Sequence, residues 1–169
     1  MIKIGKTASN ISVYSYEPDT KKELRDIIKQ RISKEGPNCN LNDIGVNKIT
    51  DMSMLFYGID FNGDISEWDV SRVTHMNYMF EYTPFNGDIS NWDTSSVREF
   101  TGMFFRSKFN NDISRWDVSR AFSTSLMFAE TSFNQDISNW IIPVNCNVYR
   151  MLRCSQIKEE YKPKSLRKK

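Results

Sequence analysis

Hydrophobic residues recur along this chain at a fixed spacing of 24 positions. The stretches FNGDISEWDV at 61, FNGDISNWDT at 85, FNNDISRWDV at 109 and FNQDISNWII at 133 each carry a Phe, an Ile and a Trp at matching places. A fixed period of roughly 20 to 50 residues indicates a repeat protein. The residues expected to form one core layer per repeat are Phe61, Ile65, Trp68, Phe85, Ile89, Trp92, Phe109, Ile113, Trp116, Phe133, Ile137 and Trp140.

The rest of the unit repeats as well, and its length limits the fold. Val73 and Met76 have apolar counterparts 24 residues later at Val97 and Phe100. Such a unit is too short for a pair of packed helices, which takes above roughly 30 residues. We therefore expect short strands that stack from repeat to repeat into parallel sheet, forming a β-solenoid of about five coils over 41–157.

The N-terminal segment follows a helical pattern instead. Leu24 and Ile28 lie on one apolar stripe within 20–34, and Asp19 or Thr20 is suited to the N-cap. This helix is expected to cover the open end of the repeats. The predicted domains are a cap over 1–40 with a possible strand, the repeats over 41–157 and a mobile basic tail over 158–169.

An acidic residue also recurs, and it admits two interpretations. The recurring residues are Asp64, Asp88, Asp112 and Asp136. Stacked carboxylates about 5 Å apart repel one another by about 0.8 kcal/mol in water, so something must compensate each of them. An Asx-type turn would do so locally, through backbone N–H groups of the same turn. Calcium bound between repeats is the alternative. We favour the turns and predict no metal site and no cofactor.

The four recurring Trp residues likewise have two possible roles. Each could bury roughly 150 to 250 Å² in the core, or together they could form an exposed ladder on which sugars or bases stack. Because Ile and Trp keep a fixed spacing in every repeat, the core role is favoured.

Charge and composition select no ligand. The chain has 23 Lys and Arg against 21 Asp and Glu, a formal net charge of +2, which does not favour nucleic acid. No stretch approaches the length of a membrane span, and the first residues do not read as a secretory signal. Three cysteines without a metal-type pairing indicate reduced thiols. We therefore expect a cytoplasmic protein without a membrane span.

No set of residues in the sequence suggests catalysis. His75 is the single histidine, and it occupies a position that varies between repeats. The chain shows no Gly-rich phosphate loop, metal-ligand cluster or nucleophile elbow. We therefore predict that the protein is not an enzyme and has no small-molecule substrate.

The stretch FNGDISEWDVSRVTHMNYMF closely resembles the repeat of the BspA-like leucine-rich-repeat surface protein family, including its mycoplasma lipoprotein type. The resemblance covers about 41–157 and extends to the lead-in KKELRDIIKQRI. It implies an α+β repeat fold, namely a short right-handed leucine-rich-repeat-like β-solenoid of about five 24-residue coils with an N-terminal helical cap. It also implies a bacterial protein of the kind usually found at the cell surface, with a phage-borne or intracellular binding protein as the alternative.

Positions that vary between fixed neighbours are where a repeat protein carries its specificity. Tyr and Arg are favoured in interface hot spots. The predicted binding residues are Arg72, Tyr78, Tyr82, Phe105, Arg115 and Arg120. We predict a non-catalytic protein–protein interaction module that binds a protein partner through these variable surface lanes; the alternative is a structural subunit of a virion or cell-surface assembly.

Overall fold

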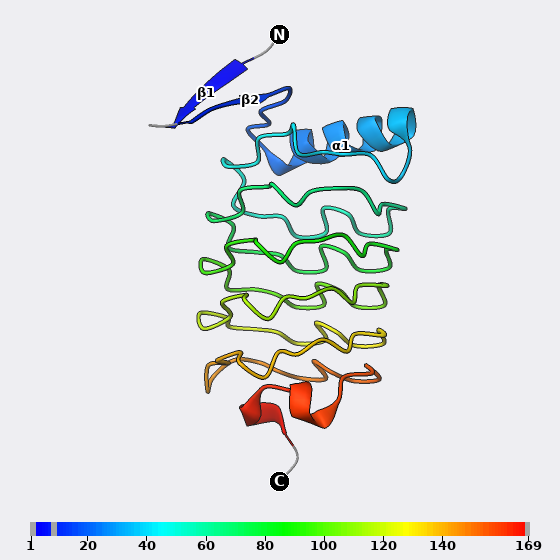
Figure 1. The fold of residues 1–169 in the computed structure, drawn as a ribbon, viewed down its shortest axis with the longest axis vertical. Helices are drawn as coiled ribbons and strands as arrows, with labels where there is room; N and C mark the ends of the chain where they lie inside the picture. Colours follow the sequence, from blue (N-terminus) through cyan, green and yellow to red (C-terminus); the bar gives the residue numbers. More distant parts are fainter. Residues whose placement is uncertain (1–2, 8–9, 168–169) are drawn as a thin grey trace.

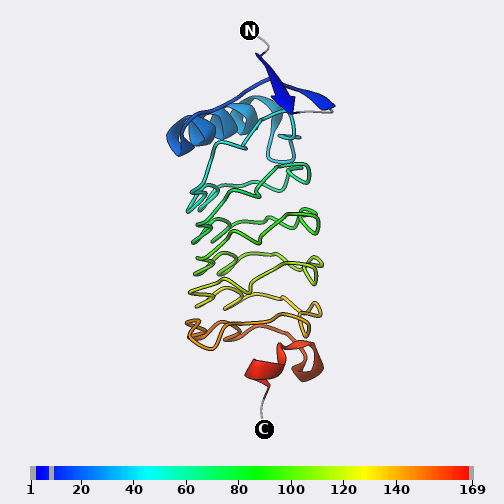
Figure 2. The same ribbon diagram turned by 90° about the vertical axis from the view of Figure 1, so that its left-hand side faces the viewer.

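A hairpin and a helix precede a stack of turns in the computed structural model, which describes residues 3–7 and 10–167 (Figure 1). The elements are strands β1 (Lys3–Thr7) and β2 (Asn10–Tyr14), helix α1 (Lys21–Glu35) and the 3-10 helices η1 (Glu159–Tyr161) and η2 (Lys164–Leu166). The two strands pair antiparallel. The 24-residue repeats lie between α1 and η1, stacked along the long axis of the molecule (Figure 2).

Helix α1 closes the N-terminal end of the stack. The Thr20 hydroxyl accepts the Glu23 N–H, and the Glu23 carboxylate accepts the Thr20 N–H, which together form a capping box. Leu24 is fully buried in the same hydrophobic cluster as the repeats. Arg31 donates to both carboxylate oxygens of Asp43, at 2.9 and 3.0 Å. The first apolar layer of the stack is thereby covered.

The Phe, Ile and Trp residues that recur every 24 positions are all buried, at 5% exposure or less. Equivalent rings stack between repeats, and the Trp68 and Trp92 rings lie 6.5 Å apart at an interplanar angle of 1°. Each Trp indole N–H donates to a carbonyl of the preceding repeat, as from Trp92 to Ile65 at 3.2 Å. The Trp side chains are therefore core residues and form no exposed ladder.

Neighbouring repeats are joined along one seven-residue stretch, which we call the left-handed segment. The left-handed segments are 52–58, 76–82, 100–106, 124–130 and 148–154. In the first four segments, every second N–H donates to a carbonyl of the next repeat, as from Tyr78 to Thr101 at 2.8 Å and from Phe80 to Met103 at 2.8 Å. The third and seventh residues of each segment have φ between 53° and 64°, namely Met54, Gly58, Tyr78, Tyr82, Gly102, Arg106, Leu126, Glu130, Arg150 and Cys154.

The predicted β-solenoid is wrong. Among the residues described, strands occur only in the hairpin, and the repeats meet through isolated parallel bridges such as Asp51 with His75 and His75 with Glu99. A strand needs consecutive residues with extended, negative φ. Positive φ values, such as 58° at Met54, interrupt any such run in the left-handed segments. Between these segments the chain turns at short intervals, as where the Trp68 N–H donates to the Ile65 carbonyl at 3.2 Å. The leucine-rich-repeat assignment is wrong for the same reason, because that unit is built on a strand.

The described part of 158–169, predicted as a mobile tail, holds η1 and η2 and packs on the last repeat. The N–H of Ile137 donates to the carbonyl of Tyr161 at 3.0 Å, and Leu166 lies against the hydrophobic core. One side of the last repeat is therefore covered by the chain itself.

Candidate partner-binding surface

The left-handed segments carry variable side chains at positions of unusual backbone conformation. A left-handed conformation costs an L-residue roughly 1 to 2 kcal/mol and favours Gly or Asn in turns. Yet Gly58 and Gly102 are the only glycines among the ten positive-φ positions of these segments. The hydrogen bonds to neighbouring repeats hold the conformation, so residue type is free to vary. Tyr82, Arg106 and Glu130 occupy the same place in successive repeats.

Five side chains from adjacent repeats form what we call the aromatic–arginine cluster: Tyr57, Tyr82, Phe105, Arg106 and Glu130. The Tyr57 and Tyr82 rings meet edge to face at 6.3 Å, and the Tyr82 and Phe105 rings lie 6.1 Å apart. The Arg106 guanidinium lies 5.3 Å from the Tyr82 ring centre and 4.9 Å from that of Phe105. Tyr82 is 46% exposed. The cluster thus offers accessible rings in a fixed arrangement.

Electrostatics hold the arginine of this cluster in place. Its Nε donates to Glu130 at 2.6 Å, and its guanidinium also donates to the Tyr82 hydroxyl. Glu130 raises the pKa of Arg106, and Arg106 lowers the pKa of Glu130, so both remain charged at neutral pH. Glu81 lies buried nearby, where burial raises the pKa of its carboxyl against the opposing effect of Arg106.

A second surface combines arginine with an exposed ring near the C-terminal end of the stack. Arg98, Arg120 and Phe122 line a cavity of about 330 Å³. The Arg98 guanidinium lies 5.3 Å from the centre of the Phe122 ring, which is 59% exposed. Cys146 also lines this cavity, and burial raises the pKa of its thiol. The thiol is therefore protonated at neutral pH and is a poor nucleophile.

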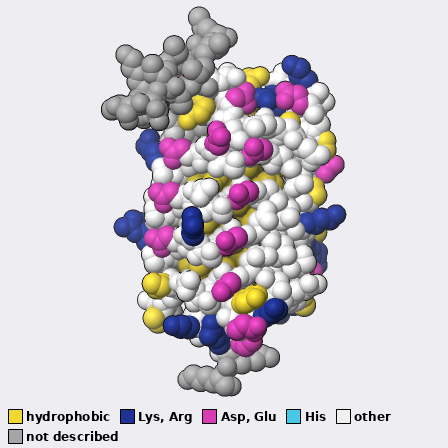
Figure 3. All heavy atoms as spheres, viewed as in Figure 1, with side chains coloured by type: hydrophobic (Ala, Val, Ile, Leu, Met, Phe, Trp, Pro, Cys, Tyr) yellow, Lys and Arg dark blue, Asp and Glu magenta, His cyan; other side chains and the backbone are white. Residues whose placement is uncertain are grey.

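The recurring Asp residues form local turns. The Ser66 N–H donates to Asp64 Oδ1 at 3.0 Å, and this hydrogen bond lowers the pKa of the carboxyl. The same bond joins Ser90 to Asp88, Ser114 to Asp112 and Ser138 to Asp136. The Asx-turn interpretation is confirmed. These exposed carboxylates recur once per repeat, and Figure 3 shows acidic side chains spaced down one face of the stack.

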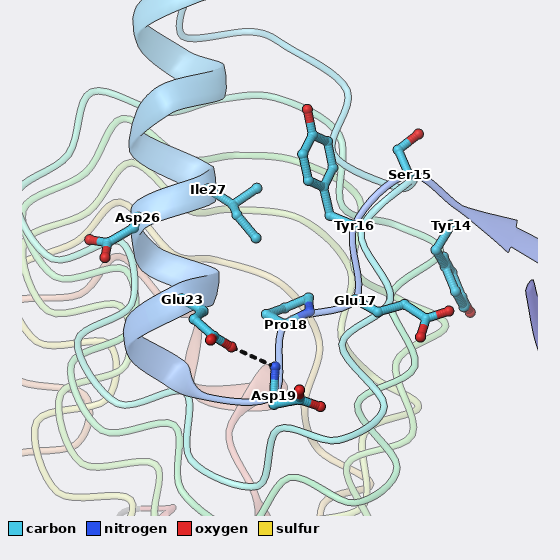
Figure 4. Close-up of a pocket in the computed structure, with 9 residues that line it drawn as sticks. All are labelled: Tyr14, Ser15, Tyr16, Glu17, Pro18, Asp19, Glu23, Asp26 and Ile27. Carbon is cyan, nitrogen blue, oxygen red and sulfur yellow. Dashed lines mark hydrogen bonds between the residues drawn. The ribbon is translucent and has the colours of Figure 1, made fainter. Parts of the chain in front are cut away.

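A cleft of about 460 Å³ separates α1 from the segment that follows β2 (Figure 4). Its acidic lining residues are Glu17, Asp19, Glu23 and Asp26. Most of this charge is already compensated, because Glu23 caps α1, Asp19 pairs with Lys48 at 2.5 Å and Asp26 pairs with Lys22 at 2.8 Å. Asp26 also points to the far side of the helix in Figure 4. Three of the four acidic residues of the cleft are therefore already paired or used as a cap.

Two of the six predicted binding residues are brought into contact. Tyr82 and Phe105 both belong to the aromatic–arginine cluster. Tyr78 lies apart from them, and its ring covers Gly102 so closely that an added Cβ would come within 2.4 Å of ring carbons. Tyr78 thus fills space over the next repeat.

The three predicted arginines lie elsewhere. Arg120 lines the cavity beside Phe122. Arg72 and Arg115 are exposed and form no salt bridge with any residue that the structure describes. The predicted set is therefore divided among separate surfaces.

Sequence reasoning missed Arg106 and Glu130, which complete the cluster. The available signal was the register itself, because both residues follow Tyr82 at intervals of 24 positions. It also missed a structural ladder in which each Asn after the recurring Phe accepts from the backbone one repeat later. The Asn86 N–H donates to Asn62 Oδ1 at 2.7 Å, and the Asn110 N–H donates to Asn86 Oδ1 at 2.8 Å.

Within the described part of the chain, no group of three or more His, Cys, Asp and Glu side chains is placed to hold a metal ion. None of the described helices is both long and apolar enough to cross a membrane.

Comparison with known proteins identifies one family. The family described as "Mycoplasma protein of unknown function, DUF285" matches residues 25–140, which is more than half of the chain. No curated protein and no solved structure matches the chain. The chain belongs to this mycoplasma protein family.

Proposed function

We propose that this member of the DUF285 family is a non-catalytic module that binds a protein partner through the aromatic–arginine cluster. The observation that carries the proposal is the packing of the Arg106 guanidinium against two aromatic rings, at 5.3 and 4.9 Å, while Glu130 holds it from a third side. Tyr and Arg that are fixed before a partner arrives lose little conformational entropy on binding.

The surroundings of the cluster support the same role. Segment 76–82, which contains the left-handed residue Tyr82, is held by four hydrogen bonds to the next repeat. Tyr82 therefore projects from a rigid frame, although it lies in a turn. A partner that packs an apolar or aromatic group on the exposed Tyr82 ring would find the polar rim already supplied by Arg106 and Glu130.

The test compares cluster variants with a matched surface control. The partner is first captured from a lysate of the native host and identified by mass spectrometry, and its dissociation constant is then measured for each variant. Tyr82→Ala combined with Arg106→Ala should weaken binding by at least about 30-fold, the effect of losing one hot spot. Arg115→Ala, at an exposed arginine outside the cluster, should change it less than about twofold.

Circular dichroism and melting temperature check that each variant is folded. Unchanged affinity for the folded double variant would refute the assignment of the binding surface. A measurable turnover of substrate by the purified protein would refute the non-catalytic role.

A further inference from the structure

One cavity lies where the side chains of the repeat depart from their register, and we call it the Phe122 cavity. It has a volume of about 330 Å³, and its lining includes Arg98, Arg120, Ala121, Phe122 and Pro143. These residues come from three successive repeats. The cavity is therefore on the side of the stack and not at its end.

A small core residue opens this cavity. The position of Ala121 is held in the three preceding repeats by Ile49, Val73 and Val97, which are all buried at 3% exposure or less. Ala121 is equally buried, at 2%, and lines the cavity. Because Ala lacks two methyl groups of Val, it leaves space beside the core that a branched side chain would fill.

The wall of the cavity departs from the register as well. Phe122 stands where Thr74 stands two repeats earlier, and its side chain is 59% exposed. Pro143 stands where Ser119 stands one repeat earlier. Apolar groups have thus taken the place of hydroxyl groups beside an open space. An exposed apolar surface of this kind is suited to contact with another molecule.

The two arginines at the cavity form no salt bridge within residues 3–7 and 10–167. Asp117, three residues before Arg120, accepts the Ser119 N–H at 2.8 Å within its own turn. The Arg98 guanidinium lies 5.3 Å from the centre of the Phe122 ring. A guanidinium beside a ring can still donate to a carboxylate in its own plane. The charge at the cavity therefore favours an anionic occupant.

We propose that the Phe122 cavity is a second binding surface, which takes an acidic side chain of a partner protein together with the apolar residue beside it. The carboxylate accepts N–H groups from Arg98 and Arg120. The apolar side chain enters the space left by Ala121, against Phe122 and Pro143. A free inorganic anion would leave this apolar wall uncovered. The inference does not rest on the aromatic–arginine cluster, with which the cavity shares no residue.

The test uses the peptide acetyl-Gly-Leu-Glu-Leu-Gly-amide, whose Glu carboxylate is its only charge, and a matched peptide with Gln in place of Glu. Isothermal titration calorimetry measures affinity, and the Ala121 methyl resonance in nuclear magnetic resonance spectra locates the peptide. We expect the Glu peptide to shift this resonance and to bind at least about tenfold more tightly than the Gln peptide. In Arg98→Gln with Arg120→Gln the two peptides should bind equally, whereas Arg115→Gln should preserve their difference.

Ala121→Val tests the space, since it restores the side chain that Val97 has one repeat earlier. We expect this variant to bind the Glu peptide at least about tenfold more weakly. Phe122→Thr restores the residue type of Thr74 at an exposed position and should weaken binding likewise, which keeps the test decisive if Ala121→Val does not fold.

Tyr82→Ala should leave peptide binding unchanged, which separates this surface from the aromatic–arginine cluster. Equal affinity for the Glu and Gln peptides would overturn the proposal. So would an Ala121 methyl resonance that does not move at saturating peptide, or undiminished binding by folded Phe122→Thr and Ala121→Val.

Discussion

Each repeat contains two kinds of turn, and they hold their shape in different ways. In the Asp turns, the Asp side chain accepts a backbone N–H of the same turn, as Asp112 accepts the Ser114 N–H at 2.8 Å. In the left-handed segments, the backbone is satisfied by the neighbouring repeat, as Gly102 donates to the carbonyl of Ser125 at 2.8 Å. The conformation of the Asp turns therefore depends on their own Asp, and that of the left-handed segments depends on hydrogen bonds to the neighbouring repeat.

The difference explains where sequence variation is tolerated. The Asp of each Asp turn recurs in four repeats, whereas the seventh position of the left-handed segments holds Gly, Tyr, Arg, Glu and Cys in turn. A conformation imposed by the stack leaves the side chain free for another role. The aromatic–arginine cluster uses this freedom.

The core on which both turns rest should give the largest effect. Trp92→Ala removes a stacked, buried ring and its hydrogen bond to Ile65, and should lower the free energy of unfolding by about 3 to 5 kcal/mol. Urea denaturation measures this loss, with Asn91→Ala as the exposed control. A loss below about 1 kcal/mol would contradict the placement of the ring in the core.

Alanine at two glycines separates backbone strain from crowding in the left-handed segments. Gly58 and Gly102 have φ of 64° and 59°, but only an added Cβ at Gly102 would meet another residue, the Tyr78 ring at 2.4 Å. Gly58→Ala should cost about 1 kcal/mol and Gly102→Ala about 2 kcal/mol. When denaturation is measured in a Tyr78→Ala background, the cost of Gly102→Ala should fall to that of Gly58→Ala. Equal costs of the two substitutions in the presence of Tyr78 would show that its ring does not crowd position 102.

The Asp turns and the cap could be predicted from sequence because their residues act locally. Asp64 followed two residues later by Ser66 is a turn composition, and Thr20 followed by Glu23 is a capping box. The period of 24 could also be predicted, and with it the inward position of the recurring Phe, Ile and Trp.

The left-handed segments could not be predicted in this way. Tyr78, Tyr82 and Leu126 are not residues that favour positive φ, and the hydrogen bonds that impose it come from another repeat. For the same reason Arg106 was missed, since its role depends on the ring of Tyr82 one repeat earlier.

In the asparagine ladder, each Asn that follows a recurring Phe accepts a backbone N–H from the next repeat. It offers a smaller test of how much such hydrogen bonds between repeats stabilise the fold. Asn86→Ala removes the acceptor of the Asn110 N–H and should cost about 1 kcal/mol. Urea denaturation with Asn91→Ala, an exposed residue of the same repeat, as control checks this cost. Equal stability of the two variants would show that water replaces the asparagine without loss.

The smallest effect concerns pH, and its sign differs between the two kinds of turn. The Ser114 N–H lowers the pKa of Asp112 below its usual 3.8, so stability present above pH 3.8 is lost as pH falls through the folded value. Burial raises the pKa of Glu81 above its usual 4.5, so stability present below pH 4.5 is lost as pH rises through the folded value. Melting temperatures measured across pH 2 to 7 should depend less steeply on pH in Asp112→Asn at the acid end and in Glu81→Gln at the upper end than in the parent protein. Slopes equal to those of the parent would contradict the assignment.

The most direct measurement places a photoreactive residue, benzoylphenylalanine, at position 82 in the aromatic–arginine cluster or at position 88 in an Asp turn. Each folded variant is irradiated with the captured partner, and the crosslinked product is quantified by mass spectrometry. We predict an abundant crosslink to the partner from position 82 and little from position 88. Efficient crosslinking from position 88 with none from position 82 would contradict the claim that the left-handed segments carry the binding surface.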